Sequence, residues 1–522
     1  TDDDRAAVED VLRRPGGTMR LRPRQADALL AALEAGGLFA PLSVGAGKTL
    51  LGALLPSLFP EVPRPVLMTT AALARQAAVM LDEYRRHWRI REDLEIVPYS
   101  TLSHPEASAL LEQRRPGLIV ADEAHALRDK DSARTKRFLR YMKAHPDTIF
   151  CAMSGTLTKR SIRDYATLIG LALGTWSPIP RDWPTLTEWA EALDPEPVRH
   201  WGALARFTTT DTGSTLGEVR EAFARRVATT RGVVVSPPEE LGTALVIRVV
   251  KTPQVPSITR ARLDLARTWE RPDGEELTTA MEVASVDRQL RLGGCYLWAE
   301  PPAPEWLRAR REWHRAVRTW LKDHAREGLD SPALLERAID RREVAEDLHG
   351  LLGEWRRVRA EYPEPPKVWR WIDDGRLLYG VEVGLSTAPP TCVFADLVEP
   401  GETLARNIEA PYFGGGPKAS EQILGEDGLR TIVCSLQAHG QGRNLQAFSR
   451  ALVLGGPPSG AVWEQLLGRL HRFGQTADEV EYLVLDLFAE ELDRAIEDAR
   501  YIAATTGAPQ KLLQATILRE AT

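Results

Sequence analysis

The chain has 522 residues, of which 43% are hydrophobic and 27% charged, a composition that is ordinary for a soluble globular protein. A chain of this length is too long for a single hydrophobic core, so two or three domains are expected. No apolar run approaches the ~20 residues that a membrane-spanning helix needs, which excludes that class. The net charge of −6 excludes a surface coated in positive charge, although a channel lined locally by Lys and Arg would still bind nucleic acid.

The cysteines and the N-terminus indicate the compartment. The acidic start, TDDDRAAVED, lacks a signal-peptide pattern. The cysteines lie far apart and form no CxxC pair, so neither a zinc site nor a disulfide framework is expected. We therefore expect a cytoplasmic protein with no membrane association.

The first pattern of interest is Leu21–Leu29, LRPRQADAL, which predicts the start of a helix. Gln25 within it is a candidate for reading the edge of an adenine through two amide hydrogen bonds, because a phosphate-binding pattern follows. The alternative is a surface helix in which Gln25 has no special role.

That phosphate-binding pattern is Pro41–Leu50, PLSVGAGKTL. Small residues let backbone N–H groups close around phosphate oxygens, while a lysine supplies charge and a threonine hydroxyl binds Mg²⁺. Leu42 stands where the general pattern has its first glycine, and an ordinary turn after a strand is the alternative. The residues assigned to the nucleotide are Gly45, Ala46, Gly47, Lys48 and Thr49.

Short apolar runs then predict buried parallel strands. One of them leads directly into Asp122-Glu123-Ala124-His125, and carboxylates at the end of a parallel strand lie where such sheets bind ligands. Asp122 is expected to hold Mg²⁺ and Glu123 to polarise the attacking water; a surface loop that happens to read DEAH is the alternative. The predicted strands of this half are Pro65–Thr70, Val97–Leu102, Gly117–Ala121 and Thr148–Met153.

The middle of the chain, from about 257 to 366, predicts mostly helices. Trp306, Trp313 and Trp320 recur every seven residues and would share one helix face, with arginines between them. Two interpretations stay open: a Trp-packed helical hairpin with a solvated basic flank, or a basic surface that grips a phosphate backbone.

Apolar runs resume after this region and predict a second α/β sheet, and the chain after Asp486 reads as helical to its end. Between them lies Gln465–Gln475, QLLGRLHRFGQ, in which Arg469 and Arg472 would share one helix face. A salt-bridged helix would explain this pair, and so would arginine fingers that reach a γ-phosphate. The predicted strands are Thr391–Ala395, Thr431–Cys434, Ala451–Leu454 and Tyr482–Leu485.

Taken in order, these motifs resemble those of superfamily 2 helicase-type ATPases, and within them the Swi/Snf-type translocases. LRPRQ, SVGAGKT, DEAH and SGTLT are similar to the family's first motifs, and LQAHGQGRNLQ to its fifth, with Gly440, Gly442, Asn444 and Leu445 matching. QLLGRLHRFGQ resembles the sixth, including the terminal RxGQ of this branch. Leu157 and Thr158 depart from the usual third motif, SGTP.

The resemblance implies an α/β fold of two RecA-like lobes around an ATP cleft, with a mostly helical insertion. Residues 1–236 would form the first lobe, 237–366 the linker and insertion, and 367–522 the second lobe. Arg469 and Arg472 would stabilise transition-state charge and Gln465 would bind the nucleotide. The residues that would contact backbone phosphates are Thr69, Thr70, Thr156 and Ser435.

The implied activity is ATP-dependent translocation along duplex DNA, with ATP and Mg²⁺ as ligands, in a compact bacterial or bacteriophage-like protein. Three alternatives remain: a strand-separating DNA or RNA helicase, a nucleic-acid-binding scaffold with a degenerate ATPase, and a motor subunit that works with partners in a DNA-processing complex. The scaffold is disfavoured by the retention of Lys48, Asp122, Glu123, Arg469 and Arg472.

Overall fold

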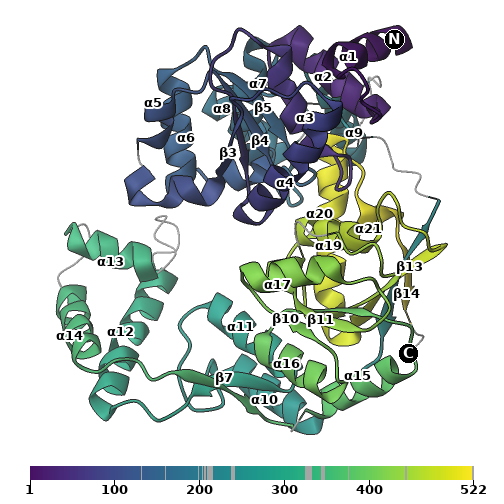
Figure 1. Ribbon diagram of the computed structural model, residues 1–522. Coiled ribbons are helices and arrows are strands. Elements are labelled where there is room, and N and C mark those ends of the chain that lie inside the picture. Colours follow the sequence, from purple (N-terminus) through teal and green to yellow (C-terminus); the bar gives the residue numbers. More distant parts are fainter. Residues whose placement is uncertain are drawn as a thin grey trace.

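The computed structural model describes residues 1–107, 109–130, 132–158, 160–197, 199–200, 202, 204, 207–208, 215–236, 242–323, 332–342, 347–373, 375–440 and 444–519. Residues 237–241, which directly follow the expected end of the first lobe, and the fifth-motif Gly442 lie outside these ranges. Two α/β units and a helical projection are present, which we call the first lobe (1–236), the second lobe (242–255 and 372–519) and the insertion (256–371) (Figure 1). Within the described ranges, no helix has the length and apolar character that crossing a membrane requires.

The first lobe is organised around a five-stranded parallel sheet with the order β1-β5-β4-β2-β3. Successive residues of β4 enter different layers: Ile119 and Ala121 belong to one apolar cluster and Val120 to the other. This alternation is expected of a sheet covered on both faces. The strands are Leu38–Ala40 (β1), Val66–Thr69 (β2), Glu95–Pro98 (β3), Leu118–Asp122 (β4) and Ile149–Met153 (β5), and the helices are Asp2–Leu12 (α1), Pro23–Ala35 (α2), Lys48–Leu54 (α3), Ala71–His87 (α4), Leu110–Arg114 (α5), Ala133–Ala144 (α6), Arg163–Leu173 (α7), Trp183–Leu193 (α8) and Leu216–Ala228 (α9).

The second lobe contains a seven-stranded parallel sheet with the order β10-β11-β9-β12-β13-β6-β14. Strand β6 precedes the insertion in sequence, so the insertion interrupts the second lobe, although residues 237–366 were expected to be linker and insertion alone. The strands are Ala244–Val250 (β6), Cys392–Ala395 (β9), Tyr412–Phe413 (β10), Ile432–Ser435 (β11), Arg450–Leu454 (β12), Glu479–Leu485 (β13) and Thr516–Arg519 (β14), and the helices are Arg376–Ser386 (α15), Val398–Asn407 (α16), Pro417–Gln422 (α17), Leu436–His439 (α18), Gly460–Leu470 (α19), Ala489–Thr506 (α20) and Lys511–Gln514 (α21).

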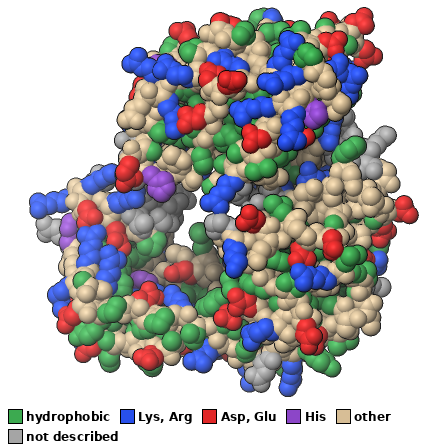
Figure 2. All heavy atoms as spheres, in the orientation of Figure 1, with side chains coloured by type: hydrophobic (Ala, Val, Ile, Leu, Met, Phe, Trp, Pro, Cys, Tyr) green, Lys and Arg blue, Asp and Glu red, His purple; other side chains and the backbone are tan. Residues whose placement is uncertain are grey.

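The insertion is helical around its own apolar core, as the tryptophan spacing predicted. Trp306 and Trp313 are buried, Trp320 packs against the same cluster, and Trp306 meets Trp355 edge-on with ring centroids 5.4 Å apart. Figure 2 shows a hollow between the insertion and the two lobes. The elements are Pro256–Thr268 (α10), Ala280–Arg291 (α11), Gly294–Trp298 (β7), Pro304–Asp323 (α12), Pro332–Asp340 (α13), Asp347–Glu361 (α14) and Lys367–Trp371 (β8), with β7 and β8 antiparallel.

Several arginines of α12 contact other parts of the insertion. Arg310 forms an ion pair with the buried Glu275, and the Arg318 guanidinium donates to the Leu277 carbonyl. Arg315 Nη2 lies 3.0 Å from a carboxylate oxygen of Glu276. These contacts fasten the loop before α11 to the helix, which favours the packing interpretation of the basic flank.

Helix α20 joins the two lobes. It belongs to the second lobe, yet the Tyr165 hydroxyl of the first lobe donates to the Thr505 carbonyl at 2.9 Å. Asp498, 7% exposed, accepts from Arg160 Nε at 2.7 Å and from the Gly460 backbone N–H at 3.3 Å. One carboxylate therefore links the loop after β5 to the first residue of α19.

Most predicted strands are confirmed, and three local expectations are wrong. Val97–Leu102 is only partly a strand, because the chain turns at Tyr99, whose hydroxyl donates to the Asp122 carbonyl at 2.9 Å. The C-terminal region is not helical throughout, since β14 pairs with β6. Arg472 does not share a helix face with Arg469, because α19 ends at Leu470.

Candidate active site

The phosphate-binding pattern forms a loop between β1 and α3. Gly45 and Gly47 have φ angles of 97° and 77°, in the left-handed region that favours glycine. At Gly47 the contact is also close, because a Cβ there would lie 2.4 Å from Gln25 Nε2. The sequence therefore needs glycine at position 47 for both conformation and space.

Two side chains from the start of α2 hold this loop. Arg22 donates from Nη1 to the Gly45 carbonyl at 2.7 Å, and Gln25 donates from Nε2 to the Gly47 carbonyl at 3.1 Å. Gln25 Oε1 also accepts from the Arg22 backbone N–H at 2.8 Å. Both atoms of the Gln25 amide are thus engaged within the protein, and the residue is 5% exposed.

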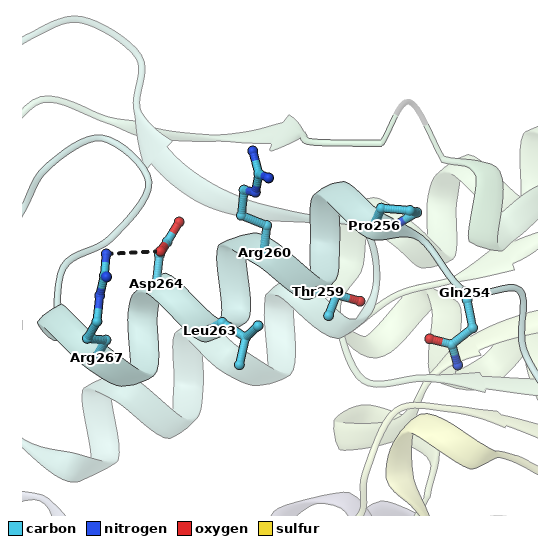
Figure 3. A pocket seen from close by; sticks show the side chains of 7 residues that line it. All are labelled: Gln254, Pro256, Thr259, Arg260, Leu263, Asp264 and Arg267. Carbon is cyan, nitrogen blue, oxygen red and sulfur yellow. Dashed lines mark hydrogen bonds and ion pairs between the residues drawn. The ribbon is translucent and has the colours of Figure 1, made fainter.

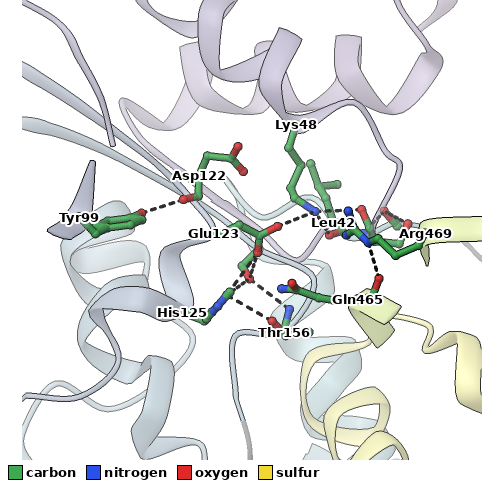
Figure 4. A network of polar contacts seen from close by, with 12 residues as sticks. Leu42, Lys48, Tyr99, Asp122, Glu123, His125, Thr156, Gln465 and Arg469 are labelled. Carbon is green, nitrogen blue, oxygen red and sulfur yellow. Dashed lines mark hydrogen bonds and ion pairs between the residues drawn. The ribbon is translucent and has the colours of Figure 1, made fainter. Parts of the chain in front are cut away.

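Lys48, the first residue of α3, is buried at the centre of the site. Its Nζ donates to the carbonyls of Leu42 and Ser43, each at 3.1 Å, and lies 3.7 Å from Glu123 Oε1 (Figure 4). The position where Leu42 replaces the usual glycine therefore still supplies a carbonyl to the lysine. A cation held in this way lies next to the carboxylates of β4.

Asp122 and Glu123 follow one another at the end of β4 but occupy different environments. Burial raises the pKa of the Asp122 carboxyl, and the charge of Glu123 raises it further, against the opposing effect of Lys48. Burial also acts to raise the pKa of Glu123, but Lys48 and His125 outweigh it and hold that pKa below its usual value. The two adjacent carboxyls therefore have pKa values shifted in opposite directions.

A hydroxyl and imidazole network holds the Glu123 carboxylate. Ser154 Oγ donates to Glu123 Oε2 at 3.2 Å, and His125 Nδ1 lies 3.0 Å from Ser154 Oγ and 3.2 Å from Glu123 Oε2. Thr156 Oγ1 lies 3.3 Å from the same imidazole nitrogen (Figure 4). The segment SGTLT is thereby tied to DEAH, and Ser154 is a site residue that sequence reasoning did not single out.

The second lobe contributes the opposite wall. A cavity of about 250 Å³ is lined by Lys48, Thr49 and Glu123 from the first lobe and by Gln465, Arg469 and Arg472 from the second, which brings together the main predicted residues. Arg469 is buried, and its Nε donates to the Gln465 carbonyl at 2.8 Å.

The RxGQ ending has a structural role next to this wall. Gln475 Nε2 donates to the carbonyls of Phe448 and Leu470, at 3.0 and 3.1 Å, and its backbone N–H donates to the Arg472 carbonyl at 3.0 Å. These bonds close the turn after α19, in which Arg472 lies. Phe473 in the same turn lies under the Arg22 guanidinium, 4.7 Å from its ring centroid, a contact between the lobes that the sequence did not predict.

The predicted phosphate-backbone contacts are dispersed. Thr69 is 1% exposed, whereas Thr70 lines the same cavity as Lys48. Thr156 lies in the Glu123 network, and the Ser435 hydroxyl accepts from the Ala438 N–H at the start of α18. The structure does not bring these four side chains together on one surface.

The residues present fit Mg²⁺ bound with a nucleotide. Asp122 Oδ1 is buried and has no hydrogen-bond partner among the described residues, and Thr49 lines the same cavity. A carboxylate and a hydroxyl are the donors that Mg²⁺ accepts alongside phosphate oxygens. Within the described ranges, no group of three or more His, Cys, Asp or Glu side chains could hold a metal ion.

A separate groove runs along α10 in the insertion (Figure 3). Its lining includes Arg260, Leu263, Asp264 and Arg267, and Arg267 Nη2 lies 3.4 Å from Asp264 Oδ1. None of its lining residues belongs to the motifs.

The chain matches no model of a known protein family and none of the curated proteins with which it was compared.

Proposed function

We propose that this chain is a nucleic-acid-dependent ATPase of the Swi/Snf type, which translocates along duplex DNA with two RecA-like lobes. The observation that carries the proposal is a cavity shared by the two lobes. Lys48, at the start of α3, and Asp122 and Glu123, at the end of β4, line it from one lobe, and Arg469 and Arg472 line it from the other. A single cavity holds all the charges that phosphoryl transfer requires.

Each side chain has a distinct task in this proposal. The loop N–H groups and Lys48 bind the β- and γ-phosphates, and Asp122 with Thr49 holds Mg²⁺, which neutralises charge on the phosphate oxygens when bound. Glu123, positioned by Ser154 and His125, orients the attacking water. His125 and Ser154 are positioning residues because they act through Glu123.

Hydrolysis requires both lobes in this proposal, because the arginines belong to the second lobe and the phosphate loop to the first. An arginine finger contributes about 10³–10⁵-fold to the rate, because charge spreads over the transferring phosphoryl group. Arg472 extends from the turn after α19 into the cavity, so its distance from a γ-phosphate changes when the lobes move. Hydrolysis is thereby coupled to movement of the lobes. If the two lobes bind the DNA backbone alternately, this movement carries the protein along the DNA.

The experiment that tests this function is the ATPase rate of the full chain without nucleic acid, then with duplex DNA, single-stranded DNA and duplex RNA. We expect the largest stimulation with duplex DNA, and none for Lys48→Ala. Preferential stimulation by single-stranded DNA or by RNA would favour a helicase, and no hydrolysis under any condition would contradict the proposal.

A further inference from the structure

Part of the wall of the nucleotide cavity belongs to α4. Leu73, Ala77, Met80 and Tyr84 lie on one face of this helix, at the spacing of successive turns, and all line the cavity. Val79, on another face, is 74% exposed. An apolar wall beside a phosphate site is suited to the flat face of a nucleobase.

Gln76 is the amide on this wall. It lines the cavity, and its Oε1 is buried with no hydrogen-bond partner among the described residues. A buried amide oxygen without a partner is unfavourable, so a ligand that donates a hydrogen bond to it gains affinity. The Gln25 amide differs in that both of its ends already have a partner, the Gly47 carbonyl and the Arg22 backbone N–H, which hold it against the phosphate loop.

We infer that Gln76, on the α4 wall, is the residue that selects the base, and that it selects adenine. The inference rests on the proposed function. Adenine presents a 6-amino donor next to a ring-nitrogen acceptor, which is the complement of a glutamine amide. Hypoxanthine has a 6-oxo acceptor at the same position, so it would face Gln76 Oε1 with a second acceptor. Gln25 and Arg22 instead shape the loop that binds the triphosphate, which every nucleotide shares.

The two glutamines can be separated by binding measurements that need no hydrolysis. Calorimetric titration of the full chain with non-hydrolysable ATP and with the hypoxanthine counterpart gives the ratio of the two affinities. We expect the wild type to prefer adenine by about tenfold or more. Gln76→Met, which keeps the length of the side chain, should still bind both analogues and reduce the preference to within about twofold.

Two variants serve as matched controls. Gln25→Ala should lower the affinity for both analogues to a similar extent and leave the ratio of the two affinities unchanged, because it loosens the phosphate loop. Val79→Ala, on the exposed face of α4, should change neither affinity. Circular dichroism checks that each variant is folded, and Gln76→Ala replaces Gln76→Met if the latter is not.

The outcomes distinguish this inference from the function on which it rests. A wild type without preference for adenine, or a Gln76 variant that keeps the preference, overturns the assignment of Gln76 and leaves the ATPase proposal intact. Loss of the preference in Gln25→Ala instead would assign base selection to Gln25. A folded wild type that binds neither analogue contradicts both the assignment of Gln76 and the ATPase proposal.

Discussion

Glu123 occupies a strained backbone conformation at the centre of the site. Its φ is +56°, in the left-handed region that non-glycine residues rarely adopt, and it follows a fully buried strand. The surrounding contacts hold it there, since Lys48 lies on one side of the carboxylate and Ser154 with His125 on the other. Backbone strain of this kind is characteristic of functional positions.

We predict that Glu123→Gln binds ATP but hydrolyses it about 10²–10⁴-fold more slowly, because the amide still accepts from Ser154 yet takes no proton from water. Lys48→Ala, in contrast, should lose nucleotide binding itself. Equilibrium binding of labelled ATP and steady-state turnover separate the two effects. Turnover near the wild-type rate in Glu123→Gln would remove its role in activating water.

A second prediction concerns pH and His314 in the insertion. The pKa of His314 is lowered from 6.5 to about 4, chiefly by burial and also by the charges of Arg310 and Arg318. The carboxylates of Glu282 and Glu364 act in the opposite direction but do not cancel this effect. The histidine is neutral when folded and takes up a proton on unfolding below pH 6.5, so its contribution to stability is complete above that pH and is lost as pH falls toward 4.

The loss should reach on the order of 2–3 kcal/mol between neutral pH and pH 4. Denaturant unfolding followed by tryptophan fluorescence reports on it, because the ring of His314 meets Trp355 edge-on at 6.2 Å. His314→Phe should show a smaller loss over the same pH range. Identical pH profiles for the two proteins would contradict the assignment.

At the scale of elements, the insertion depends on one buried ion pair. The Glu275 side chain is 1% exposed, and Arg310, whose pKa burial lowers to about 10, packs between Trp298 and Trp306. Glu275→Ala leaves this guanidinium buried without its carboxylate, and we expect it to cost about 3–5 kcal/mol.

The adjacent Glu276 supplies the control, since its partner Arg315 is 65% exposed. Glu276→Ala should cost less than about 1 kcal/mol, as surface ion pairs do. Unfolding midpoints in denaturant compare the two. Equal destabilisation would mean that the buried pair has no special part in holding the insertion.

A further element-scale prediction concerns Asp498, which contacts both Arg160 and the start of α19. Asp498→Ala should lower kcat by about tenfold with little change in KM for ATP, because it loosens the helix that carries Arg469 without touching the phosphate loop. The control is Arg500→Ala, which should match the wild type, because Arg500 is an exposed residue of α20, the helix that contains Asp498, and pairs locally with Glu497. An unchanged kcat in Asp498→Ala would show that this contact is structural only.

The sequence predicted those parts of the molecule that local patterns determine. Strands such as β4 and β12 are continuous apolar runs that are buried in the structure, and the phosphate loop is contiguous in sequence. The missed elements depend on distant partners: β14 is mostly exposed and has no apolar alternation, and it forms only by pairing with β6 at the sheet edge. The engagement of Gln25 with Gly47 was also unpredictable, because a motif fixes a residue type and not its hydrogen bonds.

At the scale of the whole molecule, the proposed activity is movement along duplex DNA, driven by ATP bound between two lobes that α20 joins. A strand-separating enzyme needs a wedge between the strands, and none of the motifs identifies one. A translocase needs only alternating contacts with the backbone, which are independent of sequence.

Displacement of a triplex-forming third strand from duplex DNA is the measurement that tests this claim most directly. We expect displacement that requires ATP and is absent in Lys48→Ala, together with poor separation of an ordinary forked duplex. Efficient unwinding of the fork without displacement of the third strand would contradict the account and favour a helicase.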